Sequence, residues 1–140
     1  MDGVLVDFQS GIDLLPKNIQ IEYLGREDEA PGIFGLMKPY PYAIESFQKL
    51  SKCYDTYILS TAPWDNSSAW SDKLNWVKTY LEKDAHKRLI LSHNKNLNEG
   101  DYLVDDSPDR NGADKFKGEL IHFQSKDFPD WKSVCSYLIK

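Results

Sequence analysis

The sequence predicts a single α/β domain, spanning residues 1–140, in which helices cover a parallel sheet. Short runs of β-forming residues alternate along the chain with segments whose apolar residues recur at helical spacing. That alternation is typical of parallel strands joined by crossover helices. The chain has 140 residues, 41% of them hydrophobic and 28% charged, which is enough for one domain with its own core.

The predicted strands are four short runs rich in β-branched and aromatic residues. They cover residues 54–60, 88–92, 101–104 and 119–123. Ahead of them, the chain begins with Asp2-Gly3 and the apolar run Val4 to Val6. An Asp-Gly pair favours a turn, because glycine reaches positive φ angles without a Cβ clash. We therefore expect a turn at the start of the chain.

Four segments are predicted to be helical from the spacing of their apolar residues. They cover residues 41–52, 67–83, 107–116 and 130–138. The inward stripe of the second helix is expected to comprise Trp70, Leu74, Val77 and Leu81. Residues 65–67 are candidate N-caps of that helix, and Asp130 is the expected N-cap of the last one.

The bulk properties exclude several classes of partner. The net charge of −5 makes a nucleic-acid polymer an unfavourable partner. There is neither a signal peptide nor an apolar run long enough to cross a bilayer, so we expect a cytoplasmic protein with no membrane partner. Cys53 and Cys135 lack zinc-ligand spacing and are expected to be free, buried thiols. The sequence leaves open whether the protein is a monomer or a homodimer.

Polar side chains follow three of the predicted strands. Thr61 comes after the first, Lys95 after the second, and the pair Asp105-Asp106 after the third. The carboxyl ends of parallel strands meet at one edge of a sheet, where ligands bind. A hydroxyl, a cation and two carboxylates at that edge can hold a phosphate group together with Mg²⁺, which shares phosphate oxygens. The sequence therefore predicts a combined phosphate and magnesium site.

Each of these side chains also has an ordinary structural role. Thr61 suits a turn or a helix cap, Lys95 a solvated surface, and Asp105-Asp106 the start of a turn before Ser-Pro. Their joint placement after three separate strands favours the binding site.

The order and spacing of these motifs resemble the haloacid dehalogenase (HAD) superfamily, and within it the 5′(3′)-deoxyribonucleotidase family. The resemblance rests on residues 1–8 (MDGVLVDF), residues 58–63 (ILSTAP), Lys95 and residues 103–109 (LVDDSPD). Segments 31–34, 41–45 and 76–81 also look like that family. The resemblance implies a three-layer, Rossmann-like α/β core with a parallel sheet. It also implies a Mg²⁺-dependent phosphomonoesterase that works through a phosphoaspartate.

The resemblance gives catalytic and metal-binding roles to matched residues. Asp2 is implied to be the general acid and then the base, and its backbone carbonyl helps to hold Mg²⁺. Lys95 stabilises the charge of the transferring group. Asp106 is the implied direct Mg²⁺ ligand, and Asp105 orients the site from behind it.

Substrate-binding roles are implied for three further positions. Thr61 and Ala62 match the residues that bind the phosphoryl group. Phe8 falls where the family places an aromatic ring against the substrate base, and a core phenylalanine beneath a cap is an equal alternative.

The nucleophile expected from the resemblance is not among the 140 residues. Family members read Asp-Met-Asp-Gly-Val after an apolar strand, and the first Asp is the nucleophile. Asp2 matches the second Asp, so the nucleophile and its strand fall directly before Met1. We therefore expect no more than trace activity from the chain as written. Three accounts stay open: an internal methionine taken as a start, a register slip that uses Val4 to Asp7, or an inactive descendant that keeps phosphate binding.

The substrate is predicted less narrowly than the chemistry. Residues 9–38 are available for a small cap inserted after the first motif, where the family makes its specificity contacts. A nucleoside monophosphate is the first expectation, and another small phosphate ester, such as a sugar phosphate, is the alternative. A non-catalytic phosphate-binding module is the competing function class.

Overall fold

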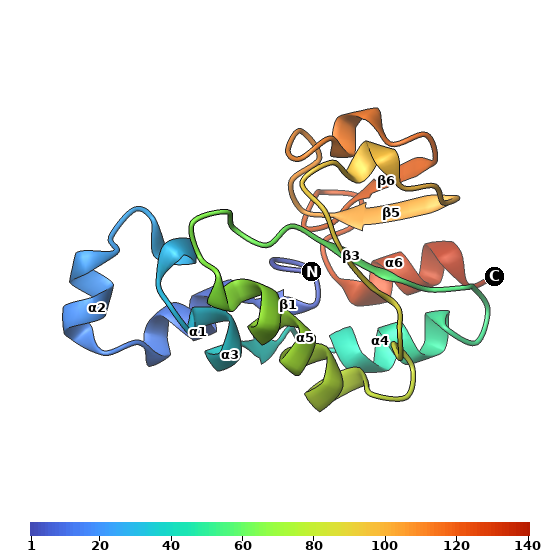
Figure 1. The fold of residues 1–140 in the computed structure, drawn as a ribbon. Helices are drawn as coiled ribbons and strands as arrows, with labels where there is room; N and C mark the ends of the chain where they lie inside the picture. Colours follow the sequence, from blue (N-terminus) through green and yellow to red (C-terminus); the bar gives the residue numbers. More distant parts are fainter.

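The structure is a computed structural model that describes all 140 residues (Figure 1). Its strands are β1 (Val6–Asp7), β2 (Lys38–Pro39), β3 (Ile58–Ser60), β4 (Leu89–Leu91), β5 (Tyr102–Asp105) and β6 (Glu119–His122). Its helices are α1 (Phe8–Leu14), α2 (Lys17–Glu22), α3 (Ile33–Leu36), α4 (Ala43–Leu50), α5 (Ser68–Leu81) and α6 (Trp131–Leu138). Short 3-10 turns lie at Glu27–Glu29, Lys95–Leu97 and Ala113–Lys115. None of the helices is both long enough and apolar enough to span a bilayer.

The strands pair two by two. β3 and β4 are parallel, with Ile58 opposite Leu89, and β5 and β6 are parallel, with Tyr102 opposite Glu119. β1 and β2 form a separate antiparallel pair. The prediction of a mixed α/β fold with parallel strands is therefore confirmed, but the sheet is interrupted between β3 and β5.

The edge of β3 that faces away from β4 is open. The Ile58 N–H donates to the Arg88 carbonyl, and the Ser60 carbonyl accepts from the Ser92 N–H. Alternate residues of a parallel strand bond to opposite sides, so the backbone groups of Leu59 point away from β4.

The edge of β5 that faces away from β6 is open in the same way. The carbonyls of Asp101 and Asp105 accept from Glu119 and Phe123 of the β6 side, so the backbone groups of Tyr102 and Val104 point away from β6. A largely apolar cavity of about 530 Å³ is lined by both β3 and β5, and also by Met1. The open edges of β3 and β5 therefore both border this cavity.

Helices cover these strand pairs. α4 and α6 pack against each other, and α3 packs on α5. The Trp131 indole N–H donates to the Val4 carbonyl (2.8 Å), which ties α6 to the start of the chain. The Trp76 indole N–H donates to the Met37 carbonyl (3.0 Å) and ties α5 to the segment before β2. The core thus fixes both flanks of the N-terminal turn.

Residues 8–36 form a helical insertion between β1 and β2. It contains α1, α2 and α3, and Figure 1 shows α2 at the far end from the β5–β6 pair. α2 buries none of its residues, and Ile21 at its end is 76% exposed. The segment expected to act as a cap is therefore helical, but its outer part carries little of the core.

Several predicted helix details are corrected. Residues 107–116 form only the 3-10 turn at Ala113–Lys115, because Asn111 and Gly112 both take positive φ angles that no helix continues. Ser67 precedes α5 without a side-chain cap, since the neighbouring Asn66 amide instead donates to the Asp28 and Ala30 carbonyls.

Two further expectations have opposite outcomes. Asp130 forms the predicted cap of α6, as a capping box with Ser133. Both cysteines are free, but Cys53 lies in the turn after α4 and is exposed, so its predicted burial was wrong. Cys135 on α6 is half-buried.

Candidate active site

The site begins at the N-terminal turn. The N–H groups of Val4, Leu5 and Val6 all converge on the Met1 carbonyl, and the Gly3 N–H donates to the Val6 carbonyl (2.9 Å). Gly3 has a φ of +70°, which a glycine adopts without strain. The predicted Asp-Gly turn is therefore present.

The turn is held against Asp106, which directly follows β5. A Cβ placed on Gly3 would lie 1.9 Å from Asp106 Oδ2, so only glycine leaves room for the carboxylate. This close approach brings the first and last sequence motifs together.

Asp106 is electrostatically poised to bind a cation. Its burial raises the pKa of its carboxyl above 3.8, and the charge of the neighbouring Asp105 raises that pKa further. The Asp106 carboxylate makes none of the hydrogen bonds or ion pairs in the structure. A nearby cation would relieve both the desolvation and the repulsion.

The oxygen donors suit a magnesium ion that is shared with a phosphate. Asp106 supplies one unengaged carboxylate, and the Asp2 backbone carbonyl accepts no backbone hydrogen bond. The chain has no cluster of three or more metal-binding side chains. Mg²⁺ commonly uses one or two carboxylates and completes its shell with water and substrate phosphate, so this sparse donor set fits Mg²⁺ rather than an all-protein cage.

Lys95 and Asp105 form a buried ion pair beside Asp106. The Lys95 ammonium contacts Asp105 Oδ2, and their side chains are 10% and 4% exposed. Asp105 Oδ1 accepts from the Ser107 backbone N–H (2.8 Å), and the Lys95 N–H donates to the Asn111 carbonyl (2.7 Å). Both Asp105 oxygens are therefore engaged, one with Lys95 and the other with the Ser107 backbone, and the orienting role of Asp105 stays a prediction.

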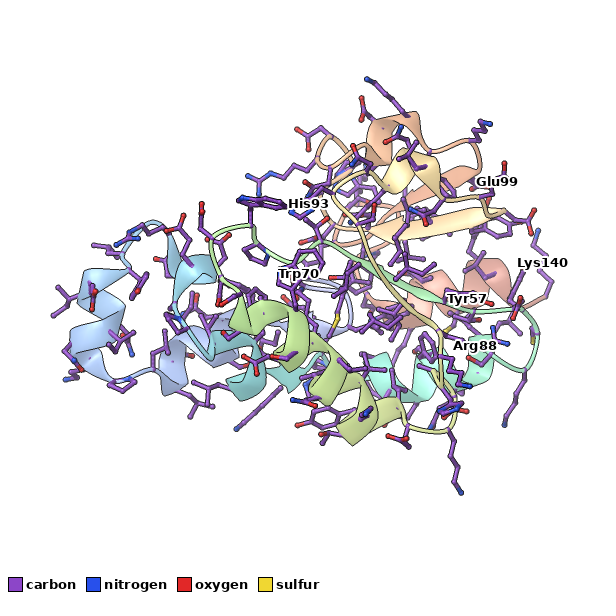
Figure 2. The ribbon with its side chains drawn as sticks, viewed as in Figure 1. Tyr57, Trp70, Arg88, His93, Glu99 and Lys140 are labelled. Atoms are coloured by element: carbon purple, nitrogen blue, oxygen red, sulfur yellow. The ribbon has the colours of Figure 1, made fainter.

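Thr61 joins the loops that follow β3 and β4. Its hydroxyl donates to the Ser92 carbonyl (2.8 Å), so it must turn away from Ser92 to donate to a phosphate. The neighbouring Ala62 is fully buried and has only its backbone to offer a ligand. Trp70 and His93 flank the same loops, with ring centroids 6.0 Å apart (Figure 2).

Phe8 packs at the start of α1. Its ring meets Phe34 edge to face, with centroids 5.9 Å apart, and it is partly buried against the core. This contact accounts for Phe8 as a packing residue beneath the helical insertion. Contact with a substrate base stays a prediction.

Lys73 lies on α5 with no exposed surface, and it is a site residue that was not predicted from the sequence. Its ammonium contacts Asp2 Oδ2 (2.5 Å) and Ser60 Oγ (3.0 Å). Burial lowers the pKa of Lys73, Asp2 opposes that shift, and Lys95 adds to it. The signal was present, because Lys73 lies four residues after Ala69 and four before Val77, on a face that is otherwise buried.

The prediction of which face of α5 is buried was wrong in part. Trp70 and Leu74 are 37% and 43% exposed, whereas Val77 and Leu81 are buried as predicted. The helix turns a face containing Lys73 inward, because the ammonium finds partners there that offset its desolvation.

Comparison with known proteins decides the family. The family described as 5′ nucleotidase, deoxy (pyrimidine), cytosolic type C protein matches residues 16–129. The chain belongs to this 5′-nucleotidase family. Its members are phosphatases, so the predictions of the family and of an enzyme are confirmed.

Relatives of this 5′-nucleotidase-family chain come from a phage and from bacteria. A protein of Vibrio phage KVP40, provisionally named 5′(3′)-deoxyribonucleotidase, is 59% identical over 138 residues, which cover 99% of this chain and 81% of the phage protein. A Staphylococcus aureus protein with the same provisional name is 37% identical over 118 residues, or 78% of this chain and 64% of that protein. A Bordetella pertussis relative is 34% identical, and the match covers 96% of this chain and 92% of the relative.

Proposed function

We propose that this chain forms the active site of a Mg²⁺-dependent phosphomonoesterase that acts on nucleoside monophosphates. The observation that carries the proposal is the contact between the Asp2-Gly3 turn and Asp106, beside the buried Lys95–Asp105 pair. Together these groups place an acid, a cation and a free carboxylate at the carboxyl ends of β3 and β5, where parallel strands present ligand sites.

The proposed reaction proceeds through a phosphoaspartate. In the family pattern the attacking carboxylate stands directly before Met1. An oxygen of this carboxylate bonds to phosphorus as the bond between phosphorus and the nucleoside oxygen breaks. Asp2 gives a proton to the departing nucleoside oxygen. Asp2 then takes a proton from the water that attacks the phosphoaspartate, the bond between phosphorus and the attacking carboxylate breaks, and inorganic phosphate leaves, which restores the attacking carboxylate and the protonated form of Asp2.

Other residues bind and neutralise the phosphate. Lys95, held by Asp105, is proposed to stabilise the charge of the transferring group. Thr61 and the Ala62 backbone are proposed to donate to phosphate oxygens. Asp106 and the Asp2 carbonyl would hold Mg²⁺, which when bound offsets negative charge on the phosphate.

The open strand edges support the placement of the attacking carboxylate. A strand joined to Met1 has an apolar cavity to enter, and backbone partners at Leu59, Tyr102 and Val104. Its last residue would then lie beside Asp2. Without such a residue, a chain that starts at Met1 should show only trace turnover.

The substrate assignment draws on the relatives. Three of them carry a name that specifies deoxyribonucleotides, and we propose the same class of substrate for this chain. We further propose that residues 1–140 act as one cytoplasmic domain in which residues 9–38 cap the site.

The test compares two proteins on thymidine 5′-monophosphate. One is the chain as written, and the other carries an apolar five-residue strand followed by Asp directly before Met1. We expect Mg²⁺-dependent phosphate release from the extended protein. The rate of phosphate release from the 140-residue chain should be lower by about 10²-fold or more. The matched control carries the same strand followed by Asn. Equal turnover of the Asp and Asn proteins would refute the proposed nucleophile, and no turnover from any of them would refute the phosphatase.

A further inference from the structure

Lys73 makes contacts with three separate elements from a fully buried position. Its ammonium lies 2.5 Å from Asp2 Oδ2 in the N-terminal turn and 3.0 Å from Ser60 Oγ at the end of β3. It also lies 4.3 Å from the ring centroid of Phe34 on α3. A lysine with no exposed surface is costly to bury, and it is retained only where partners replace its hydration.

These contacts occupy the whole ammonium group. An ammonium has three N–H donors. Two of them face Asp2 and Ser60, and the remaining side faces the π surface of Phe34. No donor of Lys73 is left for a substrate phosphate, so any effect of Lys73 on the reaction passes through Asp2.

The two oxygens of the Asp2 carboxylate have different surroundings. Oδ2 is fixed by Lys73, whereas Oδ1 is buried and has no hydrogen-bond partner. Because Lys73 engages Oδ2, Oδ1 is the Asp2 oxygen that is left without a partner. An unpaired buried oxygen is unusual in folded proteins, where most buried polar atoms are satisfied.

We propose that Lys73 is a positioning residue that holds Asp2 through Oδ2 so that Oδ1 exchanges protons with the reacting groups. This rests on the proposed function, in which Asp2 is the general acid and base. In the first step the Oδ1 proton moves to the nucleoside oxygen as its bond to phosphorus breaks. In the second step Oδ1 takes a proton from water as the water oxygen bonds to phosphorus and the bond between phosphorus and the attacking aspartate breaks. Lys73 keeps its own protons throughout.

A positioning role of Lys73 and a purely structural role predict different effects of the leaving group on the rate. An alkoxide must be protonated as it leaves, whereas p-nitrophenolate leaves without a proton. A misplaced Asp2 therefore lowers kcat/KM, which reports the first step, for a nucleoside monophosphate but not for p-nitrophenyl phosphate. A general loss of structure slows both.

The experiment uses the extended protein with Asp before Met1 and measures kcat/KM for thymidine 5′-monophosphate and for p-nitrophenyl phosphate. Lys73→Met keeps the aliphatic stem and removes the ammonium. We expect a loss of about 10- to 100-fold on the nucleotide and less than about threefold on p-nitrophenyl phosphate. The matched control is Lys78→Met, an exposed lysine of the same helix, which should leave both values within about twofold.

A second variant keeps the test decisive if Lys73→Met does not fold. Ser60→Ala preserves the Lys73–Asp2 contact but removes the other hydrogen bond of the ammonium, so the same substrate pattern is expected with a smaller loss. Equal losses on both substrates, or no loss on the nucleotide in an active protein, would overturn this inference alone. An extended protein without the substitution that hydrolyses neither substrate would overturn the proposed function and this inference with it.

Discussion

Gly3 and Asp106 approach each other so closely that a Cβ on Gly3 would sit 1.9 Å from Asp106 Oδ2. The two residues belong to the first and last motifs of the site, more than 100 positions apart in the sequence. Their contact makes the glycine a steric requirement of the carboxylate as well as of the turn.

Gly3→Ala should therefore cost more than an ordinary positive-φ glycine. We expect a loss of about 2–4 kcal/mol in the free energy of unfolding, from backbone strain and displacement of Asp106. Gly25→Ala is the matched control, because Gly25 has a φ of +82° but no atom within 4 Å of the added Cβ. Urea denaturation of both variants measures the difference. An equal loss in the two would show that the Asp106 contact is unimportant.

Lys95→Met should destabilise the fold strongly, because it leaves Asp105 buried without its cation. The expected loss is about 3–5 kcal/mol, and the double variant Lys95→Met with Asp105→Leu should recover much of it. Arg26→Ala removes the exposed Arg26–Glu29 pair and should change stability little. Urea denaturation measures whether the double variant recovers this stability. A double variant as unstable as Lys95→Met would show that the unpaired Asp105 is not the cause of the loss.

Ionisation of Asp106 should lower the stability of the folded protein at neutral pH. Its folded pKa lies above 3.8, so between the unfolded and folded pKa values the folded state binds more protons and stability falls as pH rises. Without added metal, Asp106→Asn should therefore melt higher than the unsubstituted protein at pH 7, and the two should converge below pH 3.8. Exposed Asp127→Asn is the control. A lower melting temperature for Asp106→Asn at pH 7 would contradict the assignment.

For the capping box of α6 we expect the opposite pH dependence, with stability falling as pH falls. The Ser133 backbone N–H lowers the pKa of Asp130 below 3.8, so the stabilisation is present above that pH and is lost as pH falls through the folded pKa. Asp130→Ala should lower Tm by about 2–6 °C at pH 7 and have little effect at pH 2. Thermal scans at the two pH values measure this. A Tm loss that is the same at both would exclude the charged cap.

Much of the fold was predictable because local signals agreed with the tertiary structure. The runs before Thr61 and Asp105 form β3 and most of β5, and Asp130 begins α6, since β-branched runs and side-chain caps act locally. The resemblance placed a missing strand directly before Met1, but whether its neighbours would close up was not predictable, because strand pairing depends on residues far apart in sequence.

The site was predicted in part for the same reason. The residues after each strand follow from topology, which brings Asp105 beside Lys95. Lys73 was missed because its role depends on which face α5 turns inward, and the exposed Trp70 and Leu74 had suggested a different face. A lysine between apolar positions of a helix can indicate a buried ion pair, as Lys73 forms with Asp2.

In the proposed site, Asp106 holds a magnesium ion that the substrate phosphate shares beside Lys95. The most direct measurement is phosphate release from thymidine 5′-monophosphate by the extended protein, titrated with Mg²⁺, for the Asp106→Asn variant and for the exposed control Asp127→Asn. We expect Asp106→Asn to lose about 10²-fold in rate at low Mg²⁺, or to need at least about tenfold more Mg²⁺ for half its maximal rate, and we expect Asp127→Asn to behave like the unsubstituted protein. Superimposable magnesium curves and rates for all three proteins would contradict it.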